Sequence, residues 1–313
     1  MTPPASRPDV SPDGSYLVTD EASLTPIVLA AFGRIEDPRL REITLSLISH
    51  LHACVRETRL SKREWEQAVD FLKQLAQATT GRYNGPMALS DMLGISTLVC
   101  LVNDKASDAG DLRTAGNVLG PLWRADEPEV PNGGTIVRSE TPGEPLFAAC
   151  RVLDLQGQPV PDVEVHVWQA SPEGLYENQD PQQAEMNLRA RLRTDAEGRF
   201  AFRSVLPAGY PASKTEPLAS LIRVAKRNPW RPAHVHFMFH KPGYETLTTQ
   251  VFTPYCPHLR RDVVFGATQA LVGNFRRHET DAPAEDVVGT WYSLEQTFVL
   301  APGEARLPVP PIQ

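Results

Sequence analysis

The spacing of apolar residues along the chain changes near Asp104. From residue 21 to residue 103, apolar side chains recur at three- and four-residue steps, with few turn signals between them. Such spacing places the apolar side chains on one face of a helix. The longest stripe runs through Leu40, Ile43, Leu47, Leu51 and Val55. This part of the chain is therefore predicted to be helical.

A second helix is predicted to begin after Ser61. The sequence Ser61-Lys-Arg-Glu64 matches a capping box, in which the Ser and Glu side chains satisfy free backbone N–H groups at a helix start. A further helix is predicted from about Ser90 to Val102. The stripe after the capping box consists of Trp65, Val69, Leu72 and Leu75. Both stripes must be covered, either by packing within the chain or by a helical dimer interface with an apolar channel.

After Asp104, Gly and Pro become frequent and apolar residues occur in short runs between turn sequences, which is typical of strands. Two turns, Leu155-Gln-Gly-Gln158 and Asp195-Ala-Glu-Gly198, place Gly where a positive φ is expected. The predicted strands include Phe147–Leu153, Val163–Trp168, Arg199–Val205, Ala233–Phe239 and Thr248–Thr253. We therefore expect a mostly β protein with an α-helical N-terminal domain and an antiparallel β-sandwich core.

Three segments follow from this division. Residues 1–20 are rich in Pro, Ser and Asp and are predicted to form a flexible arm, residues 21–115 a helical domain, and residues 116–313 the β-sandwich domain. Within the sandwich, the run from Val163 to Trp168 alternates as a half-buried strand should. His166 and His240 are accordingly predicted to lie on polar faces rather than to bind a metal.

Composition narrows the possible functions. The 313 residues are 41% hydrophobic, as in a globular protein, and carry a net charge of −7 without a block of basic residues, which argues against nucleic-acid binding. No stretch approaches the ~20 apolar residues of a membrane span, and residues 1–15 lack a signal-peptide core. The four cysteines have no C-x-x-C spacing and fit reduced thiols. We therefore expect a cytoplasmic protein without a membrane segment.

The pair His234 and His236 is the first candidate for chemistry. In a strand, both imidazoles would point to the same face, whereas Ala233, Val235 and Phe237 would face an apolar layer. Two imidazoles suit zinc, copper, iron or nickel about equally. An isolated His-x-His is more often part of packing than of a metal site, so the metal must be argued from other residues.

Tyr176 and Tyr210, each just after a turn-like stretch, supply that argument. A phenol has an ordinary pKa near ~10 and becomes an anionic ligand at neutral pH only beside a strongly Lewis-acidic centre. Ferric iron meets this condition best among the common metals. The two tyrosines and two histidines together favour a tyrosine-rich iron site.

Several segments resemble the intradiol ring-cleaving dioxygenases in order and spacing. In the second half they are Gly116-Asn-Val-Leu-Gly-Pro121, Val167-Trp-Gln-Ala-Ser171 leading to Gly174-Leu-Tyr176, Gly209-Tyr-Pro211, and Asn228-Pro-Trp-Arg-Pro-Ala-His-Val-His236 followed by Gln250-Val-Phe252. In the helical part they are Leu51-His-Ala-Cys-Val-Arg-Glu-Thr-Arg59 and Leu89-Ser-Asp-Met-Leu-Gly-Ile-Ser96. The resemblance covers roughly residues 21–280, and its helical part is similar to the catechol and hydroxyquinol branch rather than to the protocatechuate branch.

This resemblance implies one Fe(III) per subunit, held by Tyr176, Tyr210, His234 and His236. It implies cleavage of an aromatic diol by O2 between the two hydroxyl-bearing carbons, giving a cis,cis-muconate or maleylacetate-type product. By the same resemblance, Tyr210 leaves the metal and accepts a substrate proton, Arg231 stabilises negative charge on the ring, and Gln250 lies close to substrate and iron. A homodimer through the N-terminal helices, with bound lipid at their interface, is also implied.

The family's substrate contacts match Ala88, Asp91, Val118, Leu119, Gly120, Pro121, Leu122 and Ala212. An acidic side chain at Asp91 would accept a hydrogen bond from a third hydroxyl, which favours hydroxyquinol (benzene-1,2,4-triol) over catechol or a substituted catechol. The alternative is that Asp91 caps a helix start.

The loop after Tyr210 departs from the family pattern. Many relatives continue Pro-Ile-Pro, whereas Ala212 and Ser213 stand here in place of bulkier groups. The loop borders the expected pocket, so substrate size stays open. A non-enzyme alternative is that the β-sandwich is a binding or transport module, because such sandwiches host many functions.

Overall fold

The structure, a computed structural model, describes residues 16–104, 112–212 and 214–312. Most of the predicted N-terminal arm, residues 1–15, and Ser213 of the atypical loop lie outside these ranges. The chain divides into two compact units, Met1–Leu72 and Lys73–Gln313. This division by contacts falls at Leu72, whereas the predicted domain boundary is at residue 115.

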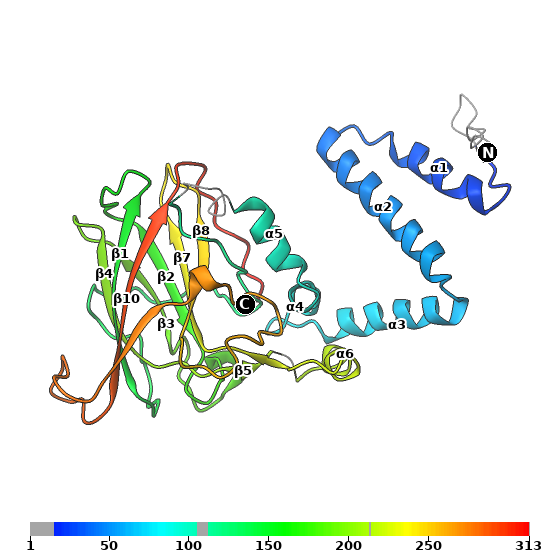
Figure 1. Ribbon diagram of the computed structural model, residues 1–313. Helices are drawn as coiled ribbons and strands as arrows, with labels where there is room; N and C mark the ends of the chain where they lie inside the picture. The colour runs from blue at the N-terminus through cyan, green and yellow to red at the C-terminus, as the bar shows by residue number, and fades with distance from the viewer. Residues whose placement is uncertain (1–15, 105–111, 213, 313) are drawn as a thin grey trace. The chain divides into compact units, whose positions relative to one another are not determined.

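The N-terminal unit contains α1 (Glu21–Phe32), α2 (Pro38–Thr58) and most of α3 (Lys62–Ala78) (Figure 1). Helix α2 begins where the Asp37 carboxylate accepts a hydrogen bond from the Leu40 N–H at 2.8 Å. Helix α3 begins at the predicted capping box: the Glu64 carboxylate accepts from the Ser61 N–H at 2.8 Å, and the Ser61 hydroxyl accepts from the Glu64 N–H at 3.3 Å. The predicted helix start is confirmed.

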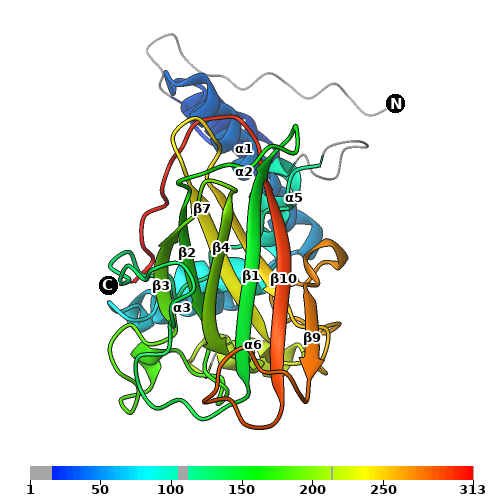
Figure 2. The same cartoon turned by 90° about the vertical axis from the view of Figure 1, so that its left-hand side faces the viewer.

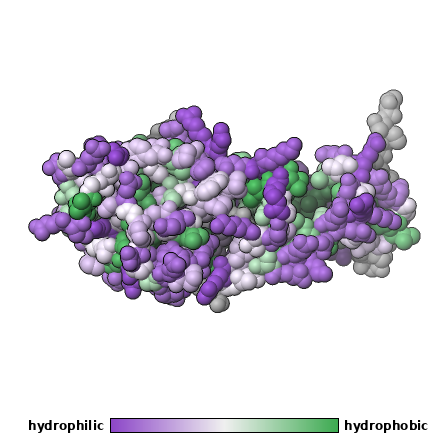
Figure 3. Space-filling view, turned by 90° about the horizontal axis from the view of Figure 1, so that it is seen from below, coloured by the Kyte–Doolittle hydropathy of each residue, from purple (hydrophilic) through white to green (hydrophobic). Residues whose placement is uncertain are grey.

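The two apolar stripes are not buried within the described chain. The five stripe residues of α2 are each between 47% and 57% exposed. On α3, Trp65, Val69 and Leu72 are exposed as well, and only Leu75 is buried. Figure 3 shows apolar side chains, in green, exposed among these helices. Of the two predicted ways to cover the stripes, packing within the chain accounts for Leu75 alone.

The helix predicted from Ser90 to Val102 is in fact two helices, α4 (Gly85–Met92) and α5 (Ile95–Asn103). They meet at Gly94, whose φ of +73° is left-handed backbone that cannot continue a right-handed helix. No single helix in the described ranges is long and apolar enough to span a membrane; α4 and α5 reach that length only as a pair bent by 71°.

The sandwich consists of two four-stranded sheets (Figure 2). One has the order β4 (Arg199–Val205), β1 (Pro145–Asp154), β10 (Trp291–Leu300), β9 (Asn274–His278). The other has the order β3 (Arg189–Arg193), β2 (Glu164–Gln169), β7 (His234–His240), β8 (Leu247–Phe252). A small ladder joins β5 (Tyr210–Pro211) to β6 (Trp230–Arg231), and α6 (Leu218–Val224) lies between them in sequence. The predicted strands are confirmed, but β1 and β10 pair in parallel, so the sandwich is not antiparallel throughout.

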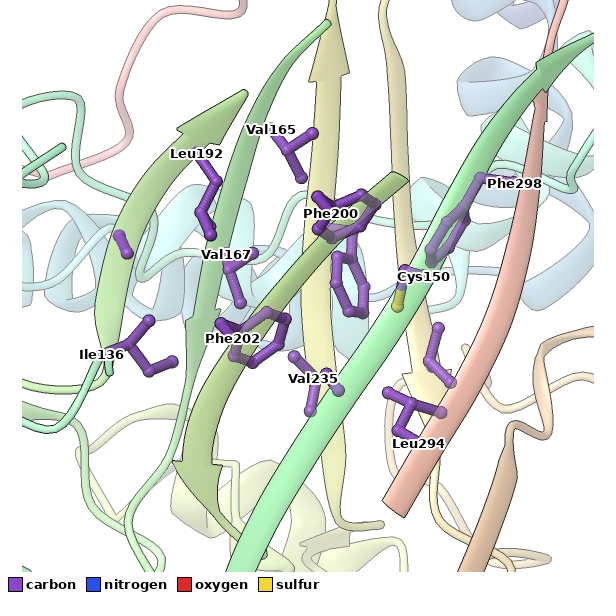
Figure 4. Close-up of a cluster of buried hydrophobic side chains, with 14 of the residues drawn as sticks. Ile136, Cys150, Val165, Val167, Leu192, Phe200, Phe202, Val235, Leu294 and Phe298 are labelled. Atoms are coloured by element: carbon purple, nitrogen blue, oxygen red, sulfur yellow. The ribbon is translucent and has the colours of Figure 1, made fainter. Parts of the chain in front are cut away.

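The main core lies between the sheets. Phe200, Phe202 and Phe298 from one sheet meet Val167 and Val235 from the other (Figure 4). The opposite face of the second sheet is also covered, so β2 is buried on both faces rather than half-buried as predicted. His166 does lie on the polar face of β2, but it is buried there and contacts Glu127 and Glu164. This second buried face is where the candidate site lies.

The two predicted glycine turns allow a matched test of backbone strain. Gly157 and Gly198 have φ values of +73° and +70°, but a Cβ at Gly157 would meet nothing within 4 Å, whereas one at Gly198 would lie 2.4 Å from the Val152 carbonyl oxygen. We expect Gly157→Ala to cost about 1–2 kcal/mol of unfolding free energy from left-handed strain alone. Gly198→Ala should cost distinctly more, because the β1 backbone must also move. Urea unfolding of both variants measures the difference, and equal losses would contradict the steric argument.

Candidate active site

The two histidines lie on the outward face of β7, away from the main core. The Nδ1 atom of His234 donates to the Pro232 carbonyl oxygen at 2.6 Å, which leaves a lone pair on Nε2. The Nε2 atoms of His234 and His236 lie 3.0 Å apart. The Trp168 ring from β2 stacks on His236 at 4.5 Å and so fixes its plane. Both imidazoles therefore direct a nitrogen at the same point.

Two tyrosines reach this point from separate loops. Tyr176 precedes a short 3-10 turn, and Tyr210 opens β5. A Cβ at Gly174 would lie 3.0 Å from the Gly209 carbonyl oxygen, so only glycine lets the two loops approach this closely. As a result, the Tyr176 and Tyr210 hydroxyls lie 3.4 Å apart, with their rings at 89° to each other.

This set of donors suits a metal ion. Burial lowers the pKa of His234 to about 3 and that of His236 well below its usual value, so both imidazoles are neutral and each can offer a lone pair. Burial and the neighbouring Tyr210 raise the pKa of Tyr176 well above its ordinary value, so a phenolate there needs a strong cation beside it. In the described part of the chain, no group of three His, Cys, Asp or Glu side chains could hold a metal. The two tyrosine hydroxyls are therefore the candidate further donors for a metal at the two histidines.

Arg231, in β6, is a buried cation at the edge of this donor set. It donates to the Gln250 side-chain oxygen at 2.8 Å and to the Asp262 carboxylate at 3.3 Å, and its Nη1 lies 3.3 Å from His234 Nε2. Burial alone would lower its pKa, but Asp262 and Tyr210 outweigh this, and the pKa lies above its ordinary value. Arg231 is therefore a permanent positive charge with a fixed orientation.

Asp262 is a buried residue beside the candidate site that the sequence analysis missed. Its buried carboxylate accepts hydrogen bonds from the backbone N–H groups of Val264, Gly266 and Ala267 as well as from Arg231. Burial raises the pKa of Asp262, but Arg231 more than offsets this and the net shift is downward. No local sequence signal marks it, because Arg231 is 31 residues away.

Gln250 connects Arg231 to the loop that was predicted to contact substrate. Its amide nitrogen donates to the Val118 carbonyl oxygen at 2.8 Å, while its oxygen holds Arg231. In the β7–β8 ladder it lies opposite His236. The Gln250 side chain is fully buried in this position.

A cleft with an empty volume of about 430 Å³, part of it open to solvent, borders the donor set. It lies wholly within the C-terminal unit. Its lining includes six of the eight predicted substrate contacts: Ala88, Asp91, Gly120, Pro121, Leu122 and Ala212. Val118 and Leu119 are not part of the lining; Val118 instead holds Gln250, and Leu119 packs beside the buried cluster of Trp123 and Trp168. The sequence analysis missed Met92 and Val264, which also line the cleft.

Asp91 is the one acidic side chain in the described lining of this cleft. It does not cap a helix start, since Asn84 caps α4 and Asp91 lies in the last turn. A carboxylate at a helix C-terminus is electrostatically unfavourable. Burial raises the pKa of Asp91 to about 6, although the Ser96 hydroxyl opposes this. Its position therefore costs stability in its ionised form and brings no capping benefit.

Both the helical part and the sandwich part of the chain match known proteins. Residues 118–298 match the family model described as Dioxygenase, and residues 37–110 match the one described as Catechol dioxygenase N terminus. The hydroxyquinol 1,2-dioxygenase of Rhizobium sp. (strain MTP-10005) is 35% identical over 92% of this chain and 97% of its own length. The catechol 1,2-dioxygenase of Candida albicans is 32% identical over 89% of this chain and 92% of its own.

The solved structure of the hydroxyquinol 1,2-dioxygenase from Pseudomonas putida DLL-E4 has a TM-score of 0.80 at 34% identity, covering 90% of this chain and 99% of that one. The two family models meet between residues 110 and 118, whereas the division of the structure by contacts falls at Leu72. With matches of this extent over both its helices and its sandwich, the chain belongs to the intradiol ring-cleavage dioxygenases and is an enzyme of that family.

Proposed function

We propose that the protein is a hydroxyquinol 1,2-dioxygenase, which cleaves benzene-1,2,4-triol with O2 to a maleylacetate-type product. The observation that carries this proposal is the buried Asp91 in the cleft, whose carboxylate can accept a hydrogen bond from a third hydroxyl on the ring. Relatives named hydroxyquinol 1,2-dioxygenase, at 35–37% identity, support the same substrate class. Catechol is the alternative, supported by the Candida albicans relative.

We propose that Tyr176, Tyr210, His234 and His236 hold one Fe(III) per subunit. Two neutral imidazoles and two phenols that can be ionised form a set with net charge −2, which suits a trivalent ion better than a divalent one. When bound there, ferric iron would supply a Lewis acid that ionises the diol and draws electron density from its ring toward reaction with O2.

The two tyrosines differ in a way that assigns them different roles. Tyr176 is 1% exposed and is held between the sheet and its loop, whereas Tyr210 is 8% exposed and opens a two-residue strand beside the cleft. A diol that binds as a dianion must lose two protons. Tyr210 is placed to take one of them on its phenolate oxygen, since its loop can move with less loss of packing.

Arg231 and its partners would stabilise the reacting ring. The guanidinium faces the cleft, and Gln250 and Asp262 hold it from behind. Negative charge that develops on the ring during oxygen attack therefore meets a cation that needs no reorganisation. Because Asp262 balances the charge of Arg231, this cation can stay buried in the absence of substrate.

We further propose a homodimer formed through the N-terminal helices, with lipid bound in the same apolar interface. The uncovered stripe on α2 supports this, since five apolar residues about half-exposed along one face need a partner surface. We also propose a cytoplasmic location, because all four cysteines are free thiols, as a reducing compartment favours.

The iron proposal predicts a coloured protein. Protein loaded with ferric iron should show a visible phenolate-to-iron charge-transfer band, which Tyr176→Phe and Tyr210→Phe each shift or bleach, with kcat/KM falling by about 100-fold or more. Tyr255→Phe is the matched control, because its hydroxyl donates to the Phe275 carbonyl oxygen and Tyr255 does not line the cleft. Absorption spectra measure the band, and iron analysis shows that each protein is loaded with metal. A wild type that is loaded with ferric iron but colourless would refute the tyrosinate site.

The assignment of Asp91 predicts a change in substrate preference. Asp91→Ala should lower the ratio of kcat/KM for hydroxyquinol to that for catechol by about 10-fold or more, since the third hydroxyl then lacks its acceptor. Met92→Leu, a near-isosteric change in the same lining, should affect both substrates alike. Oxygen uptake with each substrate measures the ratio of kcat/KM values in the wild type and in both variants. An unchanged ratio in Asp91→Ala would remove Asp91 from substrate selection, whereas a wild-type ratio in favour of catechol would support the catechol alternative.

The dimer proposal predicts that Leu47→Glu gives a monomer at micromolar concentration, because a charge would be buried in the apolar interface. Val288→Glu is a control of the same chemistry at a site that is 93% exposed on the C-terminal unit, and it should leave the assembly intact. Sedimentation equilibrium measures both. A wild type that is already monomeric would contradict the proposal.

A further inference from the structure

Three arginines on β3 share one face but differ in their surroundings. Arg189, Arg191 and Arg193 lie opposite Trp168, His166 and Glu164 of β2, while Ala190 and Leu192 between them face the main core. Their side chains are 1%, 35% and 48% exposed respectively. Only Arg189 is fully covered, and the residues that cover it belong to the candidate site.

Arg189 contacts three parts of that site at once. Its Nε donates to the Glu177 carboxylate at 2.7 Å, and Glu177 directly follows Tyr176 in the chain. Its Nη1 donates to the carbonyl oxygen of Leu122, which lines the cleft, at 2.7 Å. Its guanidinium carbon lies 5.5 Å from the centroid of the Tyr176 ring. One side chain therefore connects a proposed metal ligand to the cleft wall.

Stability is a weak explanation for this contact. Burying an Arg–Glu pair costs desolvation energy, and apolar side chains of similar size often replace such pairs without loss. Glu177 also accepts a hydrogen bond from Arg124 at 2.9 Å, so it has another cation. Within the described chain, Nη2 of Arg189 is buried without a hydrogen-bond partner, which is a further cost. The desolvation cost of burying the Arg189 guanidinium indicates a role beyond packing.

We propose that Arg189 is a positioning residue for ring cleavage, which fixes the Tyr176 ring and the Leu122 wall of the cleft relative to each other. Its charge, held over the Tyr176 ring, also lowers the energy of the electrons that this phenolate shares with ferric iron. The inference rests on the proposed iron site, and it assigns Arg189 two effects that separate experimentally, one of charge and one of geometry.

Two variants separate these effects. Arg189→Lys keeps the positive charge but loses the fork that reaches Glu177 and Leu122 together. The double variant Arg189→Met with Glu177→Leu removes both, because it replaces the Arg189–Glu177 ion pair by apolar groups. Arg124 loses Glu177 in this variant but keeps its ion pair with Glu185 at 2.6 Å. Arg191→Met is the matched control, since it removes the neighbouring arginine on the same face.

The measurements are the charge-transfer band of the ferric protein, and KM and kcat for hydroxyquinol. We expect Arg189→Lys to keep the band of the wild type but to raise KM about 10-fold with kcat less affected, because the cleft wall is loosened. We expect the double variant to show the raised KM together with a band at longer wavelength, because the phenolate electrons rise in energy. Arg191→Met should match the wild type in both.

Wild-type KM in Arg189→Lys, or an unshifted band in a folded double variant, would overturn the positioning role. If the double variant does not fold, KM of Arg189→Lys decides alone. A wild type that binds ferric iron without a visible band would instead refute the proposed iron site, so the two failures are distinguishable.

Discussion

Side-chain alternation along β7 is the constraint on which the arrangement of the site depends. Val235, Phe237 and Phe239 point into the layer between the sheets and are fully buried there. Because successive side chains of a strand point to opposite faces, His234 and His236 must then point the other way. A shift of one residue in the register would move the phenylalanines out of the core, so the packing energy of the sandwich also fixes the direction of the two imidazoles.

Buried polar and charged side chains connect the sheet to the loop from 118 to 122. Asp262 and Gln250 hold Arg231, and Gln250 also holds the Val118 carbonyl. On the other side, the Glu177–Arg189 pair holds the Leu122 carbonyl. Both ends of the loop from 118 to 122 are thus attached through buried polar groups to the face that carries the histidines. Loops held in this way can shape a cleft without regular secondary structure.

Features that depend on the local residue pattern could be predicted from the sequence. The His-x-His face, the capping box at Ser61 and five strands follow from periods of two or from turn chemistry, and the structure contains them. The break at Gly94 was missed because the apolar period continues through it and only the backbone angle shows it. The parallel β1–β10 pair and the Arg231–Asp262 pair were missed because they join residues distant in sequence, and the pattern of a single sequence does not indicate such pairs.

The proposed metal donors and the proposed selectivity residue lie on different elements. The donors lie on β7, in the loop that follows β2 and in β5, whereas Asp91 lies in the last turn of α4, outside both sheets. A residue on such a helix can change without loss of the sandwich, and its unfavourable place at a helix C-terminus is tolerable because the sandwich supplies most of the packing. On the proposed assignment of Asp91, substrate preference can therefore change through α4 while the face of the sheet that carries His234 and His236 stays the same.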